Sequence, residues 1–510
     1  MQPLVELHIV EAVPPSLKDN TGDLDRLKKA LSCENVRVPN RRIATVAGKF
    51  RQAGFRGAAV INVLPGGREL VDFLPEVPPQ LVGMALDLGT THLEACLVDM
   101  LTGVVLARGT IENAQIEYGA DILARIHFAA KNNGLAVLHD AIITCINELA
   151  DELAVKIGFA GTDIRAMSVS GNTTMTHFLL GLDPYHLCRE PYIPVVNIPE
   201  PCMAEELGLK INPASPIWVL PSIGSYFGGD LISGIIASGL DEQEHTSMLI
   251  DVGTNAEVVV GNREWLIACA GAAGPALEGG VAKMGMRAGP GAIDQVSIDK
   301  DTKEFRYRTI GDLPPKGICG SGIIDLVAEL YLSRMIDLRG KFRIDAAGDR
   351  LIKQGDGFSL IVAAAEDSAD GKPITLSQVD LDALMRSKAA MYSILRTLTN
   401  QVGTGFDQLR HIYVAGAFGQ HISPRQAIVL GMIPDLPLEV YVPIGNSSLA
   451  GAKKILLEEG ARSRSVELVK KITYVELNVN QEFMIRFSGA RFIPHTDHNL
   501  FPSVPFFEDN

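Results

Sequence analysis

The 510-residue sequence has few cysteines, and the seven that it has stand alone. No C-x-x-C pair or other matched spacing occurs, which argues against a zinc site, a disulfide framework and a plant-type iron–sulfur loop. We therefore expect reduced thiols of a cytoplasmic protein, each buried as a small apolar side chain. They are Cys33, Cys96, Cys145, Cys188, Cys202, Cys269 and Cys319.

Long apolar runs and an excess of positive charge are also missing. A membrane-spanning helix needs about 20 consecutive apolar residues, and the apolar stretch 217–240 is interrupted by Pro221, Asp230 and several glycines. The N-terminus lacks the cationic start and apolar core of a secretory signal. The formal net charge of -14 argues against a surface built for nucleic acid or an anionic membrane. We expect a soluble protein with neither partner.

The residues that are present have a globular composition, with 47% hydrophobic and 21% charged residues in a chain too long for one ordinary core. From about Gly83 onward, strand patterns alternate with long helical patterns, which indicates an α/β fold. The pattern weakens into a polar stretch at 340–380 and then resumes as a helix.

The first 80 residues differ from the rest. Asp23 is positioned to cap one helix, and Gly54 to end a second. Two β-rich runs joined by Pro65-Gly66-Gly67 predict a hairpin. The basic stretch 26–56 is a solvated helical face, a docking surface for an acidic protein partner, or a contact with a missing redox domain.

A carboxylate interrupts the apolar stretch 84–99, MALDLGTTHLEACLVD. Because 81–88 and 93–98 read as strands, Asp87 is expected at a strand end, where a turn aspartate is the structural alternative to a functional one. The stretch 248–262, MLIDVGTNAEVVVGN, repeats the pattern around Asp251. This echo suggests two copies of one half-domain, each beginning with a strand, a turn and a strand.

Two such turns facing each other would form a cleft with glycine amides on both sides and a carboxylate at each base. Glycines permit close approach of the backbone to phosphate oxygens, which exposed amides and hydroxyls satisfy. The carboxylates would hold Mg²⁺, which prefers oxygen ligands. We expect Asp87 and Asp251 to be those ligands, with Gly89, Thr90 and Thr91 as phosphate contacts.

A third element follows the predicted strand at 412–414, where Gly416-Ala417-Phe418-Gly419 precedes a predicted helix. Small residues there would let a purine and a ribose lie against the backbone. Packing alone also explains small residues at a strand–helix junction. The ordered set of three elements is therefore more informative than any one of them.

At these positions the sequence resembles the ASKHA superfamily of actin, acetate and sugar kinases and the large heat-shock chaperones. DLGTT is similar to its first phosphate motif, DVGTN to its second and VAGAFG to its adenosine motif, while 168–181 and 317–330 fall where its two connecting motifs are expected. The resemblance implies an α/β, actin-like, duplicated RNase H-like ATPase with two lobes. It divides the chain into a small α+β N-terminal domain, a first lobe, and a second lobe with a C-terminal extension, at 1–80, 81–245 and 246–510.

The resemblance also implies Mg²⁺ and ATP as cofactors, with Asp87 and Asp251 as catalytic carboxylates. Gly279 and Gly280 either line the cleft or form a plain surface loop. Asp230 either orients the attacking water or the metal, or caps a helix. The expected nucleotide contacts are Gly89, Thr90, Thr91, Gly253, Thr254, Asn255, Gly279, Gly280, Gly416, Ala417, Phe418 and Gly419.

A closer resemblance covers nearly the whole chain. The segments IPVVNIP, LPSIGSYFGGD, GMRAGPGAI and ITYVELNVNQEFMIRFSGARFIPHTD are similar to the reductive activators of corrinoid enzymes. This implies ATP-dependent return of a corrinoid protein, or corrinoid methyltransferase, from Co(II) to Co(I), with a homodimer as one possible assembly. The cysteines of that family's [2Fe-2S] domain are absent, so no iron–sulfur cluster is expected here, and the electron donor is expected in a separate chain or a missing domain.

Alternatives to this function stay open. A small-molecule kinase of the ASKHA fold and a nonredox, nucleotide-gated chaperone-like ATPase would share the same motifs. His177, on the apolar face of MTHFLLG, is expected to be a satisfied core histidine. Cys319 lacks the paired cysteine that an interfacial cluster needs.

Overall fold

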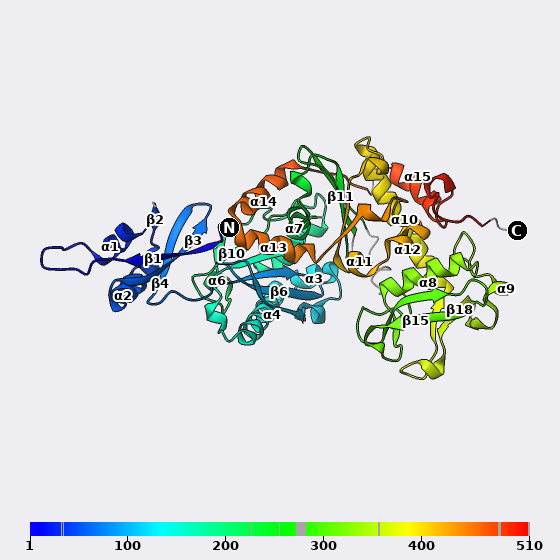
Figure 1. Cartoon of the computed structure of the whole chain (residues 1–510), viewed down its shortest axis with the longest axis horizontal. Coiled ribbons are helices and arrows are strands. Elements are labelled where there is room, and N and C mark those ends of the chain that lie inside the picture. Colours follow the sequence, from blue (N-terminus) through cyan, green and yellow to red (C-terminus); the bar gives the residue numbers. More distant parts are fainter. Residues whose placement is uncertain are drawn as a thin grey trace. The chain divides into compact units, whose positions relative to one another are not determined.

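The computed structural model describes residues 1–31, 33, 35–225, 227–253, 256–271, 282–354, 357–477 and 481–507. The chain divides into two compact units (Figure 1). Unit 1 comprises Met1–Ala237 and Ser447–Lys470, and unit 2 comprises Ser238–Asn446 and Lys471–Asn510. Residues 447–470 belong to unit 1, whereas the expected division at residue 245 assigns them to the second lobe. Among the described residues, no helix has the length and apolar character needed to cross a membrane.

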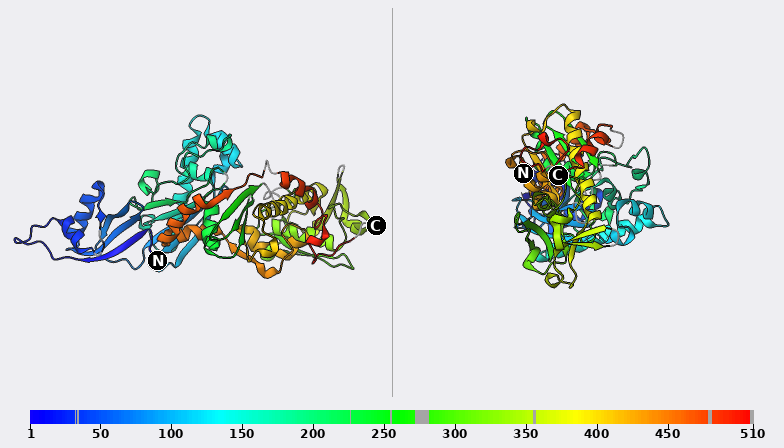
Figure 2. Two further views of the ribbon diagram at one scale, coloured as in Figure 1. Left: turned by 90° about the horizontal axis from the view of Figure 1, so that it is seen from above. Right: turned by 90° about the vertical axis from the view of Figure 1, so that its right-hand side faces the viewer.

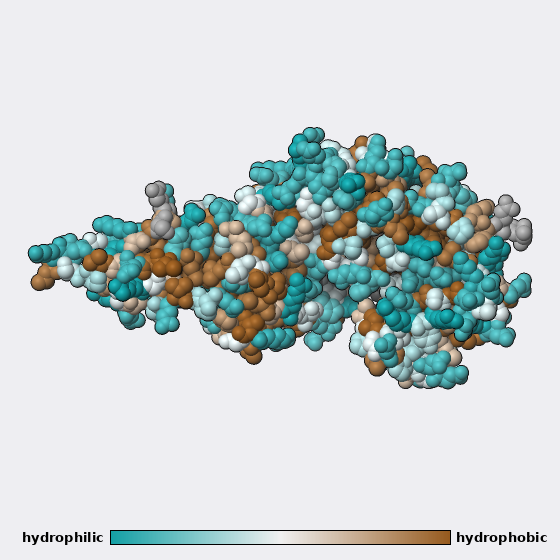
Figure 3. Space-filling view, viewed as in Figure 1, coloured by the Kyte–Doolittle hydropathy of each residue, from teal (hydrophilic) through white to brown (hydrophobic). Residues whose placement is uncertain are grey.

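The N-terminal part of unit 1 is a four-stranded sheet in the order β1-β3-β4-β2. Helices α1 and α2 pack against it through Leu27, Val46 and Phe50 (Figures 1 and 2). The loop from β1 to α1 exposes Val13 and Leu17 to solvent, and hydrophobic colour interrupts the polar surface of this region in Figure 3. The bounds are β1 Val5–Glu11, α1 Asp23–Ala30, β2 Val36–Arg37, α2 Ile43–Gln52, β3 Arg56–Leu64 and β4 Gly67–Leu74.

The predicted hairpin is confirmed, since β3 and β4 pair antiparallel with Leu64 opposite Gly67. Helix α2 ends before Gly54, whose φ of 64° suits glycine. The expected cap at Asp23 is wrong. Gly22 is the N-cap, and the Asp23 carboxylate in the first helical turn pairs with Arg51 at 2.7 Å. A carboxylate in the first turn is also favoured by the helix dipole.

Most cations of the basic stretch 26–56 are paired with carboxylates of unit 1. Arg26, Arg41, Lys49 and Arg51 lie 2.6–2.7 Å from carboxylate oxygens. These pairs offset part of the positive charge of the stretch.

Asp72, the partner of Lys49, also connects the N-terminal sheet to the rest of unit 1. Lys49 Nζ lies 2.6 Å from Asp72 Oδ1, and Arg165 Nη1 lies 2.7 Å from Asp72 Oδ2. Arg165 precedes the central sheet of unit 1, and its backbone N–H donates to the Val82 carbonyl. Asp72 therefore joins the two sheets of the unit.

The central sheet of unit 1 has the order β7-β6-β5-β8-β10-β9. Strands β5, β6 and β7 form an antiparallel meander, whereas β8 and β10 run parallel to β5. Met84 and Leu86 face a core shared with Leu138 and Ile142 of α4. The strands are β5 Val82–Leu88, β6 His92–Asp99, β7 Val105–Glu112, β8 Met167–Gly171, β9 Cys202–Met203 and β10 Pro216–Val219.

The opposite face of this sheet contacts α13, because a Cβ built on Gly83 would lie 2.9 Å from the Leu456 side chain. Successive strand residues point to opposite faces, so Asp87 shares the α13 side with Gly83. The helices of this part are α3 Ile122–Ala129, α4 Gly134–Lys156, α5 Thr173–Leu179, α6 Ala204–Leu207, α7 Gly229–Ser238, α13 Ser447–Leu457 and α14 Glu459–Lys471.

Unit 2 repeats five strands of this plan in a sheet of the order β21-β20-β11-β12-β13-β22, where the sixth strand β22 lies beside β13, whereas β9 of unit 1 lies beside β10. Strands β11, β12 and β13 form the antiparallel meander, and β20 and β21 run parallel to β11. The predicted duplication is therefore confirmed at the level of strand order and direction. The strands are β11 Ser247–Val252, β12 Ala256–Gly261, β13 Leu266–Gly271, β20 Ile412–Ala415, β21 Tyr441–Gly445 and β22 Ile472–Tyr474.

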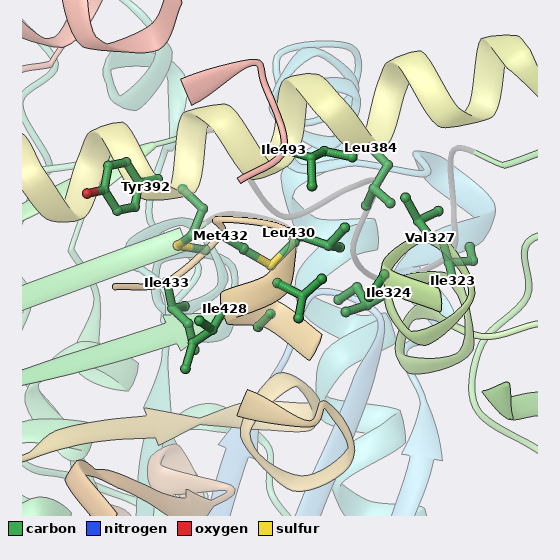
Figure 4. Packing of buried hydrophobic residues seen from close by; sticks show 14 of the residues in the cluster. Ile323, Ile324, Val327, Leu384, Tyr392, Ile428, Leu430, Met432, Ile433 and Ile493 are labelled. Atoms are coloured by element: carbon green, nitrogen blue, oxygen red, sulfur yellow. The ribbon is translucent and has the colours of Figure 1, made fainter. Parts of the chain in front are cut away.

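The remainder of unit 2 packs two small sheets and several helices into one core. Figure 4 shows Ile324 of α8, Leu384 of α10 and Ile428 of α12 within this core. The sheets are β15-β14-β16 and β17-β18-β19. The elements are β14 Ala292–Ile298, β15 Phe305–Thr309, β16 Gly317–Ile318, α8 Gly320–Leu332, α9 Ile344–Ala347, β17 Leu351–Gln354, β18 Gly357–Ala363, β19 Ile374–Ser377, α10 Gln378–Gln401, α11 Gly416–His421, α12 Pro424–Val429 and α15 Gln481–Ala490.

A fully buried lysine holds the C-terminal segment in this core. Lys388 of α10 donates to the carbonyls of Leu430, Phe492 and Pro494 at 2.8, 2.5 and 2.7 Å. Burial lowers the pKa of Lys388 well below its usual value. The three acceptors match the three donors of an ammonium group.

Candidate functional site

Asp87 lies at the carboxyl end of β5, as the sequence predicts. It is opposite Glu94 of the antiparallel strand β6 and Ser170 of the parallel strand β8. Its side chain is partly buried, and its Oδ1 accepts a hydrogen bond of 2.7 Å from Ser448 Oγ. The Asp87 carboxylate therefore lies at the end of β5 with a defined orientation, and it is not part of a plain surface turn.

The turn after Asp87 is tight and held from two sides. A Cβ built on Gly89 would lie 2.4 Å from the His92 carbonyl oxygen, so only glycine fits there. Asn113 Nδ2 donates to the Gly89 carbonyl at 3.0 Å, and Asn172 Nδ2 donates to Thr90 Oγ1 at 3.1 Å. Backbone fixed in this way is suited to binding an anion without reorganisation.

Thr91 closes the same turn. Its carbonyl accepts from the backbone N–H of Asn113 at 2.8 Å. Asn113 itself is fully buried. The structure thus brings Gly89, Thr90 and Thr91 together with Asp87, and we call these four residues the half-site of unit 1.

Asp230 lies in the first turn of α7. Asp230 is the second residue of α7 rather than its N-cap, and its Oδ1 accepts from the Leu231 backbone N–H at 2.9 Å, which satisfies one donor of the helix N-terminus. Burial raises the pKa of the Asp230 carboxyl, and hydrogen bonds from the helix start oppose that effect. A carboxyl group with a raised pKa is better suited to accepting a proton.

Unit 2 holds the second half-site, with the same strand register. Asp251 is opposite Glu257 of the antiparallel strand β12 and Ala415 of the parallel strand β20. Asp87 has the equivalent neighbours in β6 and β8. The two carboxylates therefore occupy equivalent positions in two copies of one sheet.

Gly416 lies beside Asp251 within unit 2. Its φ is 72°, and a Cβ there would lie 3.1 Å from the Val252 carbonyl oxygen and 3.3 Å from Asp251 Oδ1. The glycine of the expected adenosine motif thus borders the carboxylate of the expected second phosphate motif. No local sequence pattern predicts this adjacency.

The segment 416–419 forms the first turn of α11 rather than a turn that precedes a helix. A Cβ on Gly419 would lie 2.2 Å from the Val414 carbonyl oxygen, so its smallness serves backbone packing. Phe418 is buried in the core, where it lines a small, largely apolar cavity of about 80 Å³ with Ile422 and Tyr441. Its ring therefore contributes to packing.

Several predicted contacts lie outside the described residues: Thr254, Asn255, Gly279 and Gly280. The side chain of Ala417 is also outside this description. Gly253 is described and lies, partly exposed, directly after β11. The candidate metal ligands that the structure describes are carboxylate oxygens next to glycine-containing turns. Such oxygen ligands fit Mg²⁺ bound together with phosphate.

His177 and Cys319, which the sequence analysis considered as candidate ligands, are both buried. His177 is fully buried, with Nδ1 2.7 Å from the Thr173 carbonyl and Nε2 accepting from the Val195 N–H at 3.0 Å. Burial lowers its pKa. The interpretation of His177 as a satisfied core histidine is confirmed. Cys319 is buried and free, as are Cys96, Cys145 and Cys269, whereas the expectation of burial is wrong for Cys33, Cys188 and Cys202, which are only partly buried.

Sequence reasoning missed the polar residues that support Asp87 and its turn. Ser448, Asn113 and Asn172 come from three different elements and carry no shared motif. Ser448 is 361 residues away from its partner in the sequence. Covariation between distant positions is the kind of signal that could find such pairs.

Comparison with known proteins places the chain in a family. Three regions described for that family match in order: the RACo linker region at residues 1–77, the RACo middle region at 82–243, and the C-terminal domain of RACo, the ASKHA domain, at 245–505. The chain belongs to the RACo family.

The RACo regions correspond to parts of the fold. The linker region covers the four-stranded sheet, the middle region covers the central sheet of unit 1, and the ASKHA region covers the sheets of unit 2. The ASKHA region also includes α13, which belongs to unit 1 in the structure.

Relatives of this RACo chain are similar over most of their lengths. The corrinoid activation enzyme RamQ of Eubacterium limosum is 31% identical over 91% of this chain and 79% of its own length. The [Co(II) methylated amine-specific corrinoid protein] reductase of Methanosarcina barkeri is 24% identical over 77% and 73%. A solved structure titled reductive activator for corrinoid,iron-sulfur protein is 36% identical, with a TM-score of 0.90 over 99% of this chain and 81% of that one.

Proposed function

We propose that this RACo chain is an ATP-dependent activator that returns a corrinoid protein of a methyltransferase system from Co(II) to Co(I). The observation that carries the proposal is the ordered match of all three RACo regions along the chain. The names of the relatives, which refer to corrinoid activation and to reduction of a Co(II) corrinoid protein, support it. The proposed partner is a corrinoid protein or a corrinoid methyltransferase.

The two half-sites are the proposed determinants of Mg-ATP binding. Asp87 and Asp251 are the proposed metal ligands, because each is a partly buried carboxylate at the same register of a repeated sheet. The proposed phosphate contacts are Gly89, Thr90, Thr91 and Gly253. Gly416 is the proposed adenosine contact, because a glycine permits close approach of a ligand to the backbone and this one lies beside Asp251. When bound, Mg-ATP would supply free energy that favours one state of the protein over another.

Asp230 is the proposed acid–base residue. Its raised pKa suits a carboxyl group that orients or deprotonates a water molecule. The Leu231 N–H fixes Oδ1, so the carboxyl plane has a set direction. An Asp230→Asn variant should keep nucleotide affinity and lose turnover.

Reduction of Co(II) to Co(I) takes up one electron and no proton. ATP hydrolysis transfers no electron, so a reductant must supply it. We assign that role to a donor in a separate chain or domain. The work of ATP is then to change the affinity of this chain for its partner, which requires contacts that differ between nucleotide states.

Product analysis tests the proposal against a small-molecule kinase. The purified chain is mixed with Mg-ATP, a chemical reductant and a Co(II) corrinoid protein, and inorganic phosphate is counted against phosphorylated products. We expect phosphate release that the Co(II) partner stimulates, and about 100-fold less of it in Asp87→Asn. Asp382→Asn, which alters an exposed carboxylate paired with Lys341, is the matched control. Stoichiometric phosphorylation of a small molecule would instead identify a kinase.

A further inference from the structure

A buried chain of serine hydroxyls leads to Asp87. Ser448 Oγ donates to Asp87 Oδ1 at 2.7 Å, Ser170 Oγ lies 2.8 Å from Ser448 Oγ, and Ser233 Oγ donates to Ser170 Oγ at 2.8 Å. Ser170 and Ser233 are fully buried, and Ser448 is 7% exposed. The four side chains come from β5, β8, α7 and α13.

The donor direction along this chain follows from counting protons. A serine hydroxyl has one hydrogen. Ser448 uses its hydrogen on the carboxylate, so in the contact with Ser170 it must accept. Ser170 therefore donates to Ser448, and it accepts from Ser233. Every hydroxyl dipole points toward Asp87, and aligned hydrogen bonds strengthen one another in a low-dielectric interior.

Close packing of two helices brings the chain together. A Cβ built on Gly451 of α13 would lie 2.4 Å from the Ser233 carbonyl oxygen of α7. Ser448 and Gly451 are three residues apart and share one face of α13. That face thus contacts α7 at Gly451 and reaches β5 and β8 at Ser448. Both helices also adjoin the points where the chain passes between units 1 and 2, at 237/238 and 446/447.

We infer that Ser448 is a positioning residue of Asp87, and that Ser170 and Ser233 fix the direction in which its hydroxyl donates. The inference rests on the proposed role of Asp87 as a Mg²⁺ ligand. A ligand carboxylate whose orientation is held by a neighbouring hydrogen bond binds metal more tightly, and loss of such partners weakens metal affinity roughly 10- to 100-fold. A hydroxyl anchor on one carboxylate oxygen fixes the orientation of the other.

The test is the Mg²⁺ dependence of ATP binding, measured by calorimetry, and of ATP hydrolysis in single variants. We expect Ser448→Ala to raise the apparent Mg²⁺ constant roughly 10- to 100-fold, with kcat at saturating Mg²⁺ within about threefold of wild type. Ser170→Ala and Ser233→Ala should give progressively smaller shifts in the same direction. Ser448→Thr, which keeps the hydroxyl, should restore the wild-type constant.

Ser168→Ala is the matched control. Ser168 also lies in β8, is fully buried, and donates to α13 at the Ala452 carbonyl at 2.7 Å, but it is outside the chain to Asp87. A merely structural role would make Ser168→Ala and Ser448→Ala alike in Mg²⁺ dependence, and that result would overturn the inference. So would a wild-type Mg²⁺ constant in Ser448→Ala. Absence of Mg-ATP binding by the wild type would contradict the proposed function itself, whereas the two results above would overturn only the inference about Ser448.

Discussion

Replacement of Asp72 by asparagine should weaken the connection between the two sheets of unit 1. The Asp72 side chain is 9% exposed and bridges Lys49, which is 43% exposed, and Arg165, which is 14% exposed. Removing one partner from a buried ion pair costs about 3–5 kcal/mol. Because the Lys49 end is partly solvated, we expect about 2–4 kcal/mol for Asp72→Asn.

Hydrogen exchange of β3 and β4 measures this loss in the full chain. At about 1.4 kcal/mol per tenfold change, exchange of these amides should become roughly 30- to 1,000-fold faster. Arg37→Ala is the matched control, because Arg37 belongs to the same sheet but is 79% exposed and lies 4.0 Å from Glu69. Exchange in Asp72→Asn that stays within about threefold of this control would refute the reasoning.

The same pair predicts a pH dependence. Burial opposes ionisation of Asp72, but hydrogen bonds from Lys49 and Arg165 outweigh it and lower the pKa of this carboxyl. A lowered pKa in the folded state means that the stabilisation is complete above the unfolded value, about 3.9, and is lost as the pH falls through the folded value. The difference between wild type and Asp72→Asn should therefore be constant from pH 5 to 8 and shrink below pH 4.

Two further substitutions test other parts of the account. Lys388→Met should lower the free energy of unfolding by about 3 kcal/mol, because three buried carbonyls lose their donor. Arg386→Ala, at an exposed position of the same helix, should change it by less than about 0.5 kcal/mol. Equal urea midpoints in the two variants would contradict this prediction. Gly416→Ala should weaken ATP binding roughly tenfold, since the new Cβ crowds Asp251. Gly48→Ala, at a helical position with open space around it, should leave calorimetric ATP affinity unchanged, and a similar loss in both variants would argue against a local effect.

The parts of the fold that local patterns describe could be predicted from the sequence. The apolar strand before Asp87, the glycine turn and the following strand are adjacent in sequence, so their hairpin is visible in alternation and turn residues. The same pattern at Asp251 indicated a duplication, which the strand order confirms. The sheet β17-β18-β19 was missed because short strands among charged residues have no clear period.

The candidate site was less predictable, because tertiary packing assembles it. Ser448 reaches Asp87 only when α13 packs on β5 and β8, and Gly416 reaches Asp251 only when β20 pairs with β11. The nucleotide contact expected of Phe418 stays a prediction, and no local pattern indicated that its ring packs in the core of unit 2. A motif shows which positions are small or polar. The direction in which each side chain points depends on the helix that the motif begins.

The cobalt spectrum of a corrinoid protein tests the central claim most directly. A Co(II) corrinoid protein and a chemical reductant are mixed with this chain, with and without Mg-ATP, and Co(I) formation is followed by absorbance. The account predicts Co(I) only when both the chain and ATP are present, and none with Asp87→Asn or Asp251→Asn. Co(I) formation at the same rate without ATP would contradict it.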